Sequence, residues 1–232
     1  MVCATVLEHP TYQRVVKLLE TQVGRDKLMR TVQYFARFLS YFLFRKGYPK
    51  SAVLYWRQVM TTLSQSRKLF RLGKPLSHVK AAAGAYGNKN ADPILRATTV
   101  LRNLGTTGFL TFDSLLWLHQ SKLRPLSGPS ARRIQVISLK FWLFSLVAGM
   151  VNSGRRYYQA KQRESALRVE GEKDVAVVKK VVEEEKDATK QFVLFLLDSF
   201  IPLSGLQWVN FDDGFVGLAG VITSVAGLRA VW

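Results

Sequence analysis

The stretch LFRLGKPLSHVKAAAGAY, from Leu69 to Tyr86, has the pattern of an amphipathic helix. Its apolar residues recur every three or four positions and would line one side of a helix: Leu69, Leu72, Leu76, Val79, Ala83 and Tyr86. The basic side chains in and just before it would lie on the opposite side: Arg67, Arg71, Lys74 and His78. This pattern is typical of a helix in a membrane surface, where leucines enter the acyl chains and cations meet lipid headgroups.

The same pattern has a second interpretation, in which the apolar stripe faces a protein core and the basic side faces water. Gly73 and Pro75 also interrupt the stretch. Pro75 cannot donate a hydrogen bond to the carbonyl of Arg71, so the helix either kinks or divides there. Because the apolar stripe keeps its phase across this point, the sequence favours a kink.

Composition limits the class of protein and its partners. The chain has 232 residues, of which 48% are hydrophobic, and this excludes a disordered chain. Its one cysteine, Cys3, excludes an intramolecular disulfide, and we expect no signal peptide at the N-terminus. Residues 1–154 contain 23 Lys/Arg and only 5 Asp/Glu, so they account for most of the basic surplus. Such a surplus indicates a nucleic acid or an anionic membrane as the partner.

The periodicity predicts an all-α, membrane-associated protein with amphipathic helices and one or two hydrophobic helices in its C-terminal half. We expect helices at 11–20, 25–46, 51–64, 94–104 and 107–118, with a break at Gly24. We divide the chain into a basic N-terminal helical region (1–130) that includes the amphipathic helix 66–86, a hydrophobic helix (131–153), a charged helical arm (154–190) and a hydrophobic C-terminal hairpin or span (191–232). The arm is expected to be interrupted at Gly171.

Two segments are candidates for crossing a membrane. The first, 134–151, contains Lys140, and a lysine at mid-membrane costs about 2.5–3.5 kcal/mol, so a buried or half-inserted helix is an alternative. The second, 214–232, carries one charge, Arg229, near its end, and we favour spanning or deep insertion over a buried hairpin. Small residues in this segment are predicted to let helices pack closely: Gly217, Ala219, Gly220, Thr223, Ser224 and Gly227.

The sequence lacks the residue patterns of catalytic and metal sites. His9, His78 and His119 are scattered, Cys3 is alone, and acidic residues are sparse in the first 154 positions. We therefore expect no metal, no cofactor and no enzyme. Nucleic acid is also not expected, because the aromatic residues fall on the apolar sides of the helices and the cations on the other sides.

Three segments resemble a known family. They are GRDKLMRTVQYFARFLSYF within 12–43, KPLSHVKAAAGAY at 74–86 and GLAGVITSVAGL at 217–228, and the opening MVC…HP is similar too. Together they resemble the fungal type of the peroxisomal membrane-elongation peroxins, the eleventh peroxin. The resemblance implies a peroxisomal membrane protein that elongates the organelle and promotes its division and proliferation. It also implies two partners, further copies of the chain and a dynamin-type fission GTPase, besides the anionic phospholipid membrane that the basic surplus indicates.

These observations lead to one hypothesis and one alternative. In the hypothesis, an apolar wedge enters the cytosolic leaflet (Leu69, Leu72, Leu76, Val79 and Ala83), and nearby cations bind lipid headgroups (Arg67, Lys68, Arg71 and Lys74). In the alternative, the protein is a pore for small metabolites, with Lys140 and Asp198 as the polar residues that line it.

Overall fold

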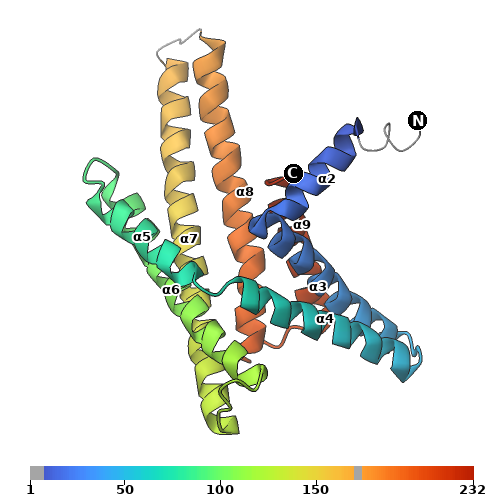
Figure 1. Ribbon diagram of the computed structural model, residues 1–232. Coiled ribbons are helices and arrows are strands. Elements are labelled where there is room, and N and C mark those ends of the chain that lie inside the picture. Colours follow the sequence, from blue (N-terminus) through green and yellow to red (C-terminus); the bar gives the residue numbers. More distant parts are fainter. Residues whose placement is uncertain (1–7, 170–173) are drawn as a thin grey trace. The chain divides into compact units, whose positions relative to one another are not determined.

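The described chain consists of helices joined by short links, shown in Figure 1. The computed structural model describes residues 8–169 and 174–232, and no strand occurs in this part of the chain. The all-α prediction is therefore confirmed for the described residues. The helices form two compact units. Unit 1 consists of the described residues up to Leu72 together with Asn210–Trp232, and unit 2 consists of Gly73–Val209.

Unit 1 is built around its second helix, α3. It contains α2 (Pro10–Glu20), α3 (Gln22–Arg45), α4 (Lys50–Phe70) and α9 (Asp213–Arg229), and α3 contacts each of the other three. The break between α2 and α3 falls at Thr21, whose hydroxyl accepts a hydrogen bond from the Gly24 N–H and so caps α3. The predicted break at Gly24 was wrong. Gly24 lies inside α3, where a Cβ atom would come within 2.1 Å of the Leu18 carbonyl oxygen.

The contact between α3 and α9 depends on glycines. A Cβ atom on Gly217 would lie 2.6 Å from the backbone nitrogen of Phe38, and one on Gly220 would lie 2.3 Å from the Tyr34 ring. At the N-terminus of α9, the Arg37 guanidinium binds the Asp213 carboxylate at 2.6 Å. The backbones can approach this closely only because these α9 positions have no side chain.

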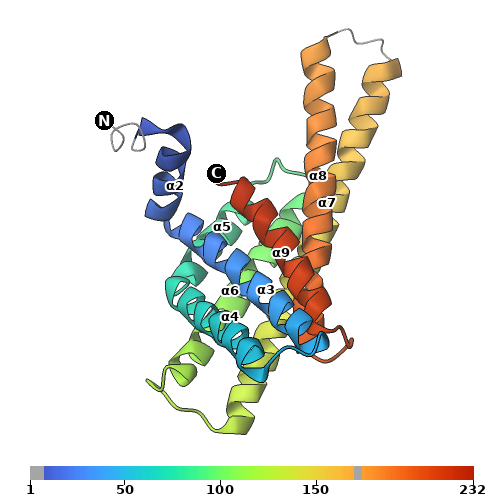
Figure 2. The same cartoon turned by 90° about the vertical axis from the view of Figure 1, so that its right-hand side faces the viewer.

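Unit 2 is a series of helices in which each packs on the next, as Figure 2 shows. It contains α5 (Lys74–Gly87), α6 (Pro93–Gln120), α7 (Gly128–Val169) and α8 (Val175–Gly205). The last part of α7 and the first part of α8 run side by side to their connection, and we call these residues, 154–169 and 175–190, the arm. Gly171, the predicted interruption of the arm, lies outside the described residues.

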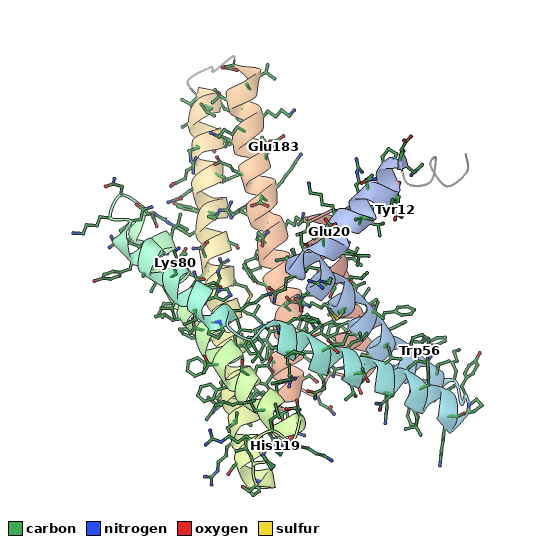
Figure 3. All side chains as sticks on the ribbon, viewed as in Figure 1. Tyr12, Glu20, Trp56, Lys80, His119 and Glu183 are labelled. Atoms are coloured by element: carbon green, nitrogen blue, oxygen red, sulfur yellow. The ribbon has the colours of Figure 1, made fainter. Side chains whose placement is uncertain are left out.

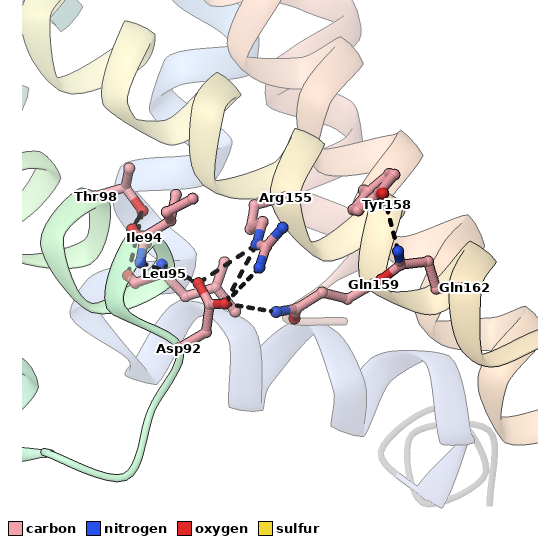
Figure 4. A network of polar contacts seen from close by, with 8 residues as sticks. All are labelled: Asp92, Ile94, Leu95, Thr98, Arg155, Tyr158, Gln159 and Gln162. Carbon is pink, nitrogen blue, oxygen red and sulfur yellow. Dashed lines mark hydrogen bonds and ion pairs between the residues drawn. The ribbon is translucent and has the colours of Figure 1, made fainter.

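A polar network joins α6 to α7 where α6 begins (Figure 4). Asp92 caps α6 by accepting hydrogen bonds from the N–H groups of Ile94 and Leu95, both at 3.0 Å. The same carboxylate binds Arg155 at 2.7 Å and accepts a hydrogen bond from the Gln159 amide at 3.0 Å. The Arg155 hydrogen bond is the main cause that holds the pKa of Asp92 below its usual value.

Several predicted helix boundaries need correction. The stretch 69–86 is not one kinked helix, because α4 ends at Phe70 and α5 begins at Lys74. Gly73 between them has a φ of +81°, which a residue with a side chain rarely adopts, so the chain leaves the helix there. The break expected between 94–104 and 107–118 is absent, because α6 is continuous past residue 105. Helices α7 and α8 run across the divisions that we placed after residues 153 and 190.

The two candidate spans differ in length. Among the described helices, α7 alone is long and apolar enough to cross a membrane, and only 28% of its apolar segment is buried within the protein. Helix α9 has 17 residues, ends at Arg229 and is shorter than the predicted segment 214–232. It extends about 26 Å, slightly less than the hydrocarbon core of a typical bilayer, which is about 30 Å thick.

The α3–α9 contact gives a first prediction. Gly217→Ala should destabilise unit 1 by about 1–3 kcal/mol, because the added methyl group overlaps the Phe38 backbone. The measurement is the thermal unfolding midpoint of the detergent-solubilised protein. Gly154→Ala is the matched control, since no atom lies within 4 Å of its added Cβ. Equal midpoints for the two variants would contradict the predicted close packing.

The Asp92 network gives a prediction on pH. Asp92→Asn keeps an N-cap acceptor but removes the charge that binds Arg155, so it should lower the unfolding midpoint at pH 7. Because the pKa of Asp92 is lowered in the folded protein, its stabilising effect is present above the unfolded pKa and is lost as the pH falls through the folded pKa. The difference between wild type and variant should therefore shrink below about pH 4. A difference that stays constant down to strongly acidic pH would refute this role for the carboxylate.

Candidate membrane-binding site

Helix α5 carries the C-terminal part of the predicted amphipathic stretch. Gly73 precedes it, and its carbonyl accepts a hydrogen bond from the Leu76 N–H at 3.1 Å. Pro75 lies in the first turn, where a missing N–H is tolerated and the fixed φ suits a helix. The proline that was expected to kink a longer helix therefore helps to start this shorter one.

The apolar stripe of α5 is exposed. Leu76 and Tyr86 have exposed fractions of 75% and 76%, and Val79 and Ala83 between them are also exposed. A different face of the helix packs on α6, where Ala82 is buried and the His78 Nδ1 atom lies 3.1 Å from the Asn103 Oδ1 atom. The stripe therefore does not face the core of unit 2. His78, placed by the sequence on the cationic side, is half-buried and contacts α6.

The two remaining apolar residues of the stretch lie in unit 1. Leu69 is in the last turn of α4 and Leu72 follows this helix, and both side chains are exposed. The stripe that the sequence predicted as continuous is thus divided between the end of α4 with the residues that follow it, in unit 1, and α5, in unit 2. Each part presents exposed apolar side chains.

Arg67 is not placed to bind lipid headgroups. The residue is only 7% exposed, its Nε donates to Asp26 at 3.0 Å, and one terminal nitrogen donates to the Gln33 amide oxygen at 2.7 Å. Burial is the main cause that lowers the pKa of Arg67, while the Asp26 carboxylate acts in the opposite direction. Asp26 is the one acidic residue between Glu20 and Asp92. A single carboxylate in such a basic region could have indicated from the sequence that Asp26 pairs with a cation inside the protein.

The other predicted cations lie closer to the surface. Lys68, Arg71 and Lys74 are half-buried, and the Arg71 guanidinium donates to the Arg67 carbonyl at 3.2 Å. Lys80, which the sequence reasoning did not select, is exposed on α5 directly after Val79 (Figure 3). A cation next to an exposed apolar stripe is typical of an interfacial helix, so Lys80 belongs with Lys74 in the α5 site.

The small residues of the C-terminal segment lie against α3 of the same chain. Five of them are buried: Gly217, Ala219, Gly220, Thr223 and Ser224. A Cβ atom on the sixth, Gly227, would lie 3.0 Å from the Lys27 ammonium nitrogen. The Arg30 guanidinium donates to the Thr223 hydroxyl at 3.2 Å.

The residues proposed to line a pore both belong to unit 2. Lys140 is exposed on α7, and Asp198 is half-buried on α8. No group of three or more His, Cys, Asp or Glu side chains that could hold a metal ion occurs in the part of the chain that the structure describes.

The Arg67–Asp26 pair gives a prediction on stability. Arg67→Ala should destabilise the protein by about 3 kcal/mol, because it removes one partner of an ion pair in a buried site. Lys68→Ala, at the neighbouring half-buried position, is the control and should change stability much less. Chemical denaturation of the two variants in detergent checks this, and a similar loss in both would disprove the structural role of Arg67.

Comparison with known proteins places this architecture in a family. Residues 12–232 match the peroxisomal biogenesis factor 11 (PEX11) family. Peroxisomal membrane protein PMP27 of Saccharomyces cerevisiae is 31% identical, and the match covers 100% of this chain and 99% of that protein. Peroxisomal biogenesis factor 11 of Schizosaccharomyces pombe is 29% identical (99% and 98% covered), and human peroxisomal membrane protein 11A is 25% identical (90% and 91% covered).

No solved structure matches the chain. The relatives are named as peroxisomal membrane proteins or biogenesis factors, and the family match spans nearly the whole sequence. The family and the location that the sequence predicted are therefore confirmed. This chain belongs to the peroxisomal biogenesis factor 11 family and is a peroxisomal membrane protein involved in peroxisome biogenesis.

Proposed function

We propose that this protein elongates and tubulates the peroxisomal membrane by inserting the apolar stripe of α5 into the cytosolic leaflet. The observation that supports this most is the exposure of Leu76, Val79 and Tyr86 on a helix whose other face is held by α6. A wedge that enters one leaflet expands it relative to the other, so the membrane curves. Elongation of this kind would promote division and proliferation of the organelle.

Both the apolar stripe and the lysines of α5 contribute to the free energy of membrane insertion. Burying a leucine or valine side chain contributes about 1.5–3 kcal/mol. A cation near an anionic surface contributes about 1 kcal/mol, and Lys74 and Lys80 are the two on α5. The apolar stripe is the larger of the two terms, so anionic lipid should strengthen insertion without being its sole cause.

Insertion of the stripe does not require α5 to leave α6. The face that packs on α6 contains His78 and Ala82, and the exposed stripe is on a different face. We propose that Leu69 and Leu72 of unit 1, with Lys68 and Arg71 near them, form a second interfacial group. Arg67 is left out of this group because it is bonded to Asp26.

We also propose the two protein partners that the family resemblance implies, which are further copies of this chain and a dynamin-type fission GTPase. We propose no catalytic role. Since the small residues of α9 contact α3 of the same chain, we propose that self-association uses other apolar surfaces. We do not propose a pore within unit 2, because Lys140 is exposed and therefore not enclosed by its helices.

The test is a change that alters the stripe and leaves the α6 contact intact. Leu76→Asp places a charge in the stripe and should reduce liposome binding through α5 about tenfold or more, since at least 1.4 kcal/mol of leucine burial is lost. Tubules should then disappear from electron micrographs of liposomes with the full-length protein.

Ser77→Asp is the matched control, because it adds the same charge at the next exposed position, outside the stripe. It should still form tubules. Tubulation by Leu76→Asp at the wild-type level would rule out α5 as the wedge. Conductance across planar bilayers that is lost in Lys140→Leu would instead support the pore alternative.

A further inference from the structure

The turn between α6 and α7 is strongly basic. It contains Lys122 and Arg124, and Arg132 and Arg133 follow in the first turns of α7. No acidic residue occurs anywhere between Asp113 and Glu164. All four cationic side chains are exposed. We call the segment 121–133, which carries these four cations, the basic turn.

The basic turn is an ordered structure. Lys122 adopts a φ of +61°, and the Leu126 N–H donates to the His119 Nδ1 atom at 2.9 Å. The Ser127 hydroxyl donates to the Ser130 hydroxyl at 2.8 Å at the start of α7. Within this turn Leu123 is 68% exposed. The backbone is thus fixed in a shape that presents cations and one leucine outward, a combination suited to an interface between water and lipid.

The position of the basic turn along the helices matches the edge of a hydrocarbon layer. Arg133 directly precedes the apolar segment 134–151, which extends about 27 Å, close to the hydrocarbon thickness of about 30 Å. Two stacked ring pairs join the apolar parts of α6 and α7: Phe109–Trp142 at 5.0 Å and Phe112–Phe141 at 5.7 Å between ring centroids. If this segment of α7 spans the membrane, the basic turn lies at one surface.

The opposite end of α7 is also rich in cations, but several of them form ion pairs with carboxylates. Figure 3 shows the two ends, with His119 beside the basic turn and Glu183 in the arm. In the arm, cations bind carboxylates of the same unit: Arg155–Asp92, Arg156–Asp187, Lys161–Glu164 and Arg163–Glu184. None of the four cations of the basic turn forms an ion pair with a described carboxylate, and Arg132 donates only to the Gln135 amide at 3.3 Å.

We propose that the basic turn binds the phosphate headgroups of anionic phospholipids and so fixes this end of α6 and α7 at a membrane surface. A lipid phosphate supplies the negative charge that the protein provides in the arm but not in the basic turn. Arginine suits this ligand, since its planar guanidinium donates two hydrogen bonds to a phosphate. The inference does not depend on insertion of α5.

The test uses the full-length protein in nanodiscs of phosphatidylcholine with a minor fraction of phosphatidylinositol. Native mass spectrometry then compares the bound phosphatidylinositol with its fraction in the membrane. Changing Lys122, Arg124, Arg132 and Arg133 together to Gln should reduce the preference for phosphatidylinositol about tenfold. Lys179, Lys180, Lys186 and Lys190, four exposed lysines of the arm, changed together to Gln form the control with the same net charge, and this control should keep the preference.

Two further comparisons distinguish lipid binding at the basic turn from insertion of α5 and from binding of free phosphate. The variant of the basic turn should still form tubules on liposomes, whereas Leu76→Asp should not, so a failed wedge and a failed basic turn give different results. Excess inorganic phosphate should not displace the lipid, because the leucine and the membrane position favour a headgroup. Displacement by free phosphate, or an unchanged preference in the variant of the basic turn, would overturn the proposal.

A depth measurement does not depend on the charge changes. The single native cysteine is Cys3, so Cys3→Ser with Leu123→Cys gives one labelling position in the basic turn. A fluorophore there should be quenched by lipids labelled near the headgroup and not by lipids labelled at the chain ends. Quenching by neither lipid would place the basic turn in water and disprove the assignment.

Discussion

Polar side chains at the contact between α6 and α7 set the register of these two helices. The Asn152 amide donates to the Leu95 carbonyl and to the hydroxyls of Thr98 and Thr99, at 2.7 to 3.1 Å. The Ser138 hydroxyl donates to the Phe109 carbonyl at 3.2 Å. A buried polar group without a partner costs about 1–3 kcal/mol, so α6 cannot slide along α7 without losing several such bonds. Among the described residues, every buried side-chain nitrogen and oxygen atom has a partner.

This arrangement leaves the large apolar side chains on the outside. Exposed residues on α7 include Ile137, Phe141, Phe144, Val147 and Val151. A substantial part of the apolar surface of α7 is therefore not buried within the protein. A lipid environment covers such side chains, and helix contacts then depend on glycine, on hydroxyl groups and on close packing. Gly105 and Gly149 serve this purpose, since added Cβ atoms would lie 2.9 Å from the rings of Phe144 and Phe195.

Much of the fold could be predicted from the sequence because helical periodicity is local. Helix α3 begins and ends within three residues of the predicted segment 25–46. The sequence favoured a kink over a division at Gly73 because the spacing of the apolar residues continues through this point. The spacing of side chains cannot show that the backbone of one residue adopts a left-handed conformation. The continuous α6 was missed because glycine at 105 suggests a break, whereas here it gives room for Phe144 on α7.

The candidate site was predictable in its apolar part and less so in its charged part. Exposure of Leu76 and Val79 follows the predicted stripe. The burial of Arg67 depends on Asp26, which lies 41 residues earlier in the chain, and a helical pattern contains no information about such a distant partner. The contact of His78 with Asn103 has the same origin, because it arises from the packing of α5 on α6.

The ion pairs of the arm have a consequence for its response to ionic strength. Arg156–Asp187 and Arg163–Glu184 link α7 to α8 through side chains that are substantially exposed to solvent. Salt screens exposed charges over about 8 Å at physiological concentration and over about 3 Å at 1 M. The arm should therefore loosen during a high-salt wash of isolated membranes, while the contacts between the apolar parts of α6, α7 and α8 persist. Proteases added after such a wash would reach the arm before the rest of unit 2.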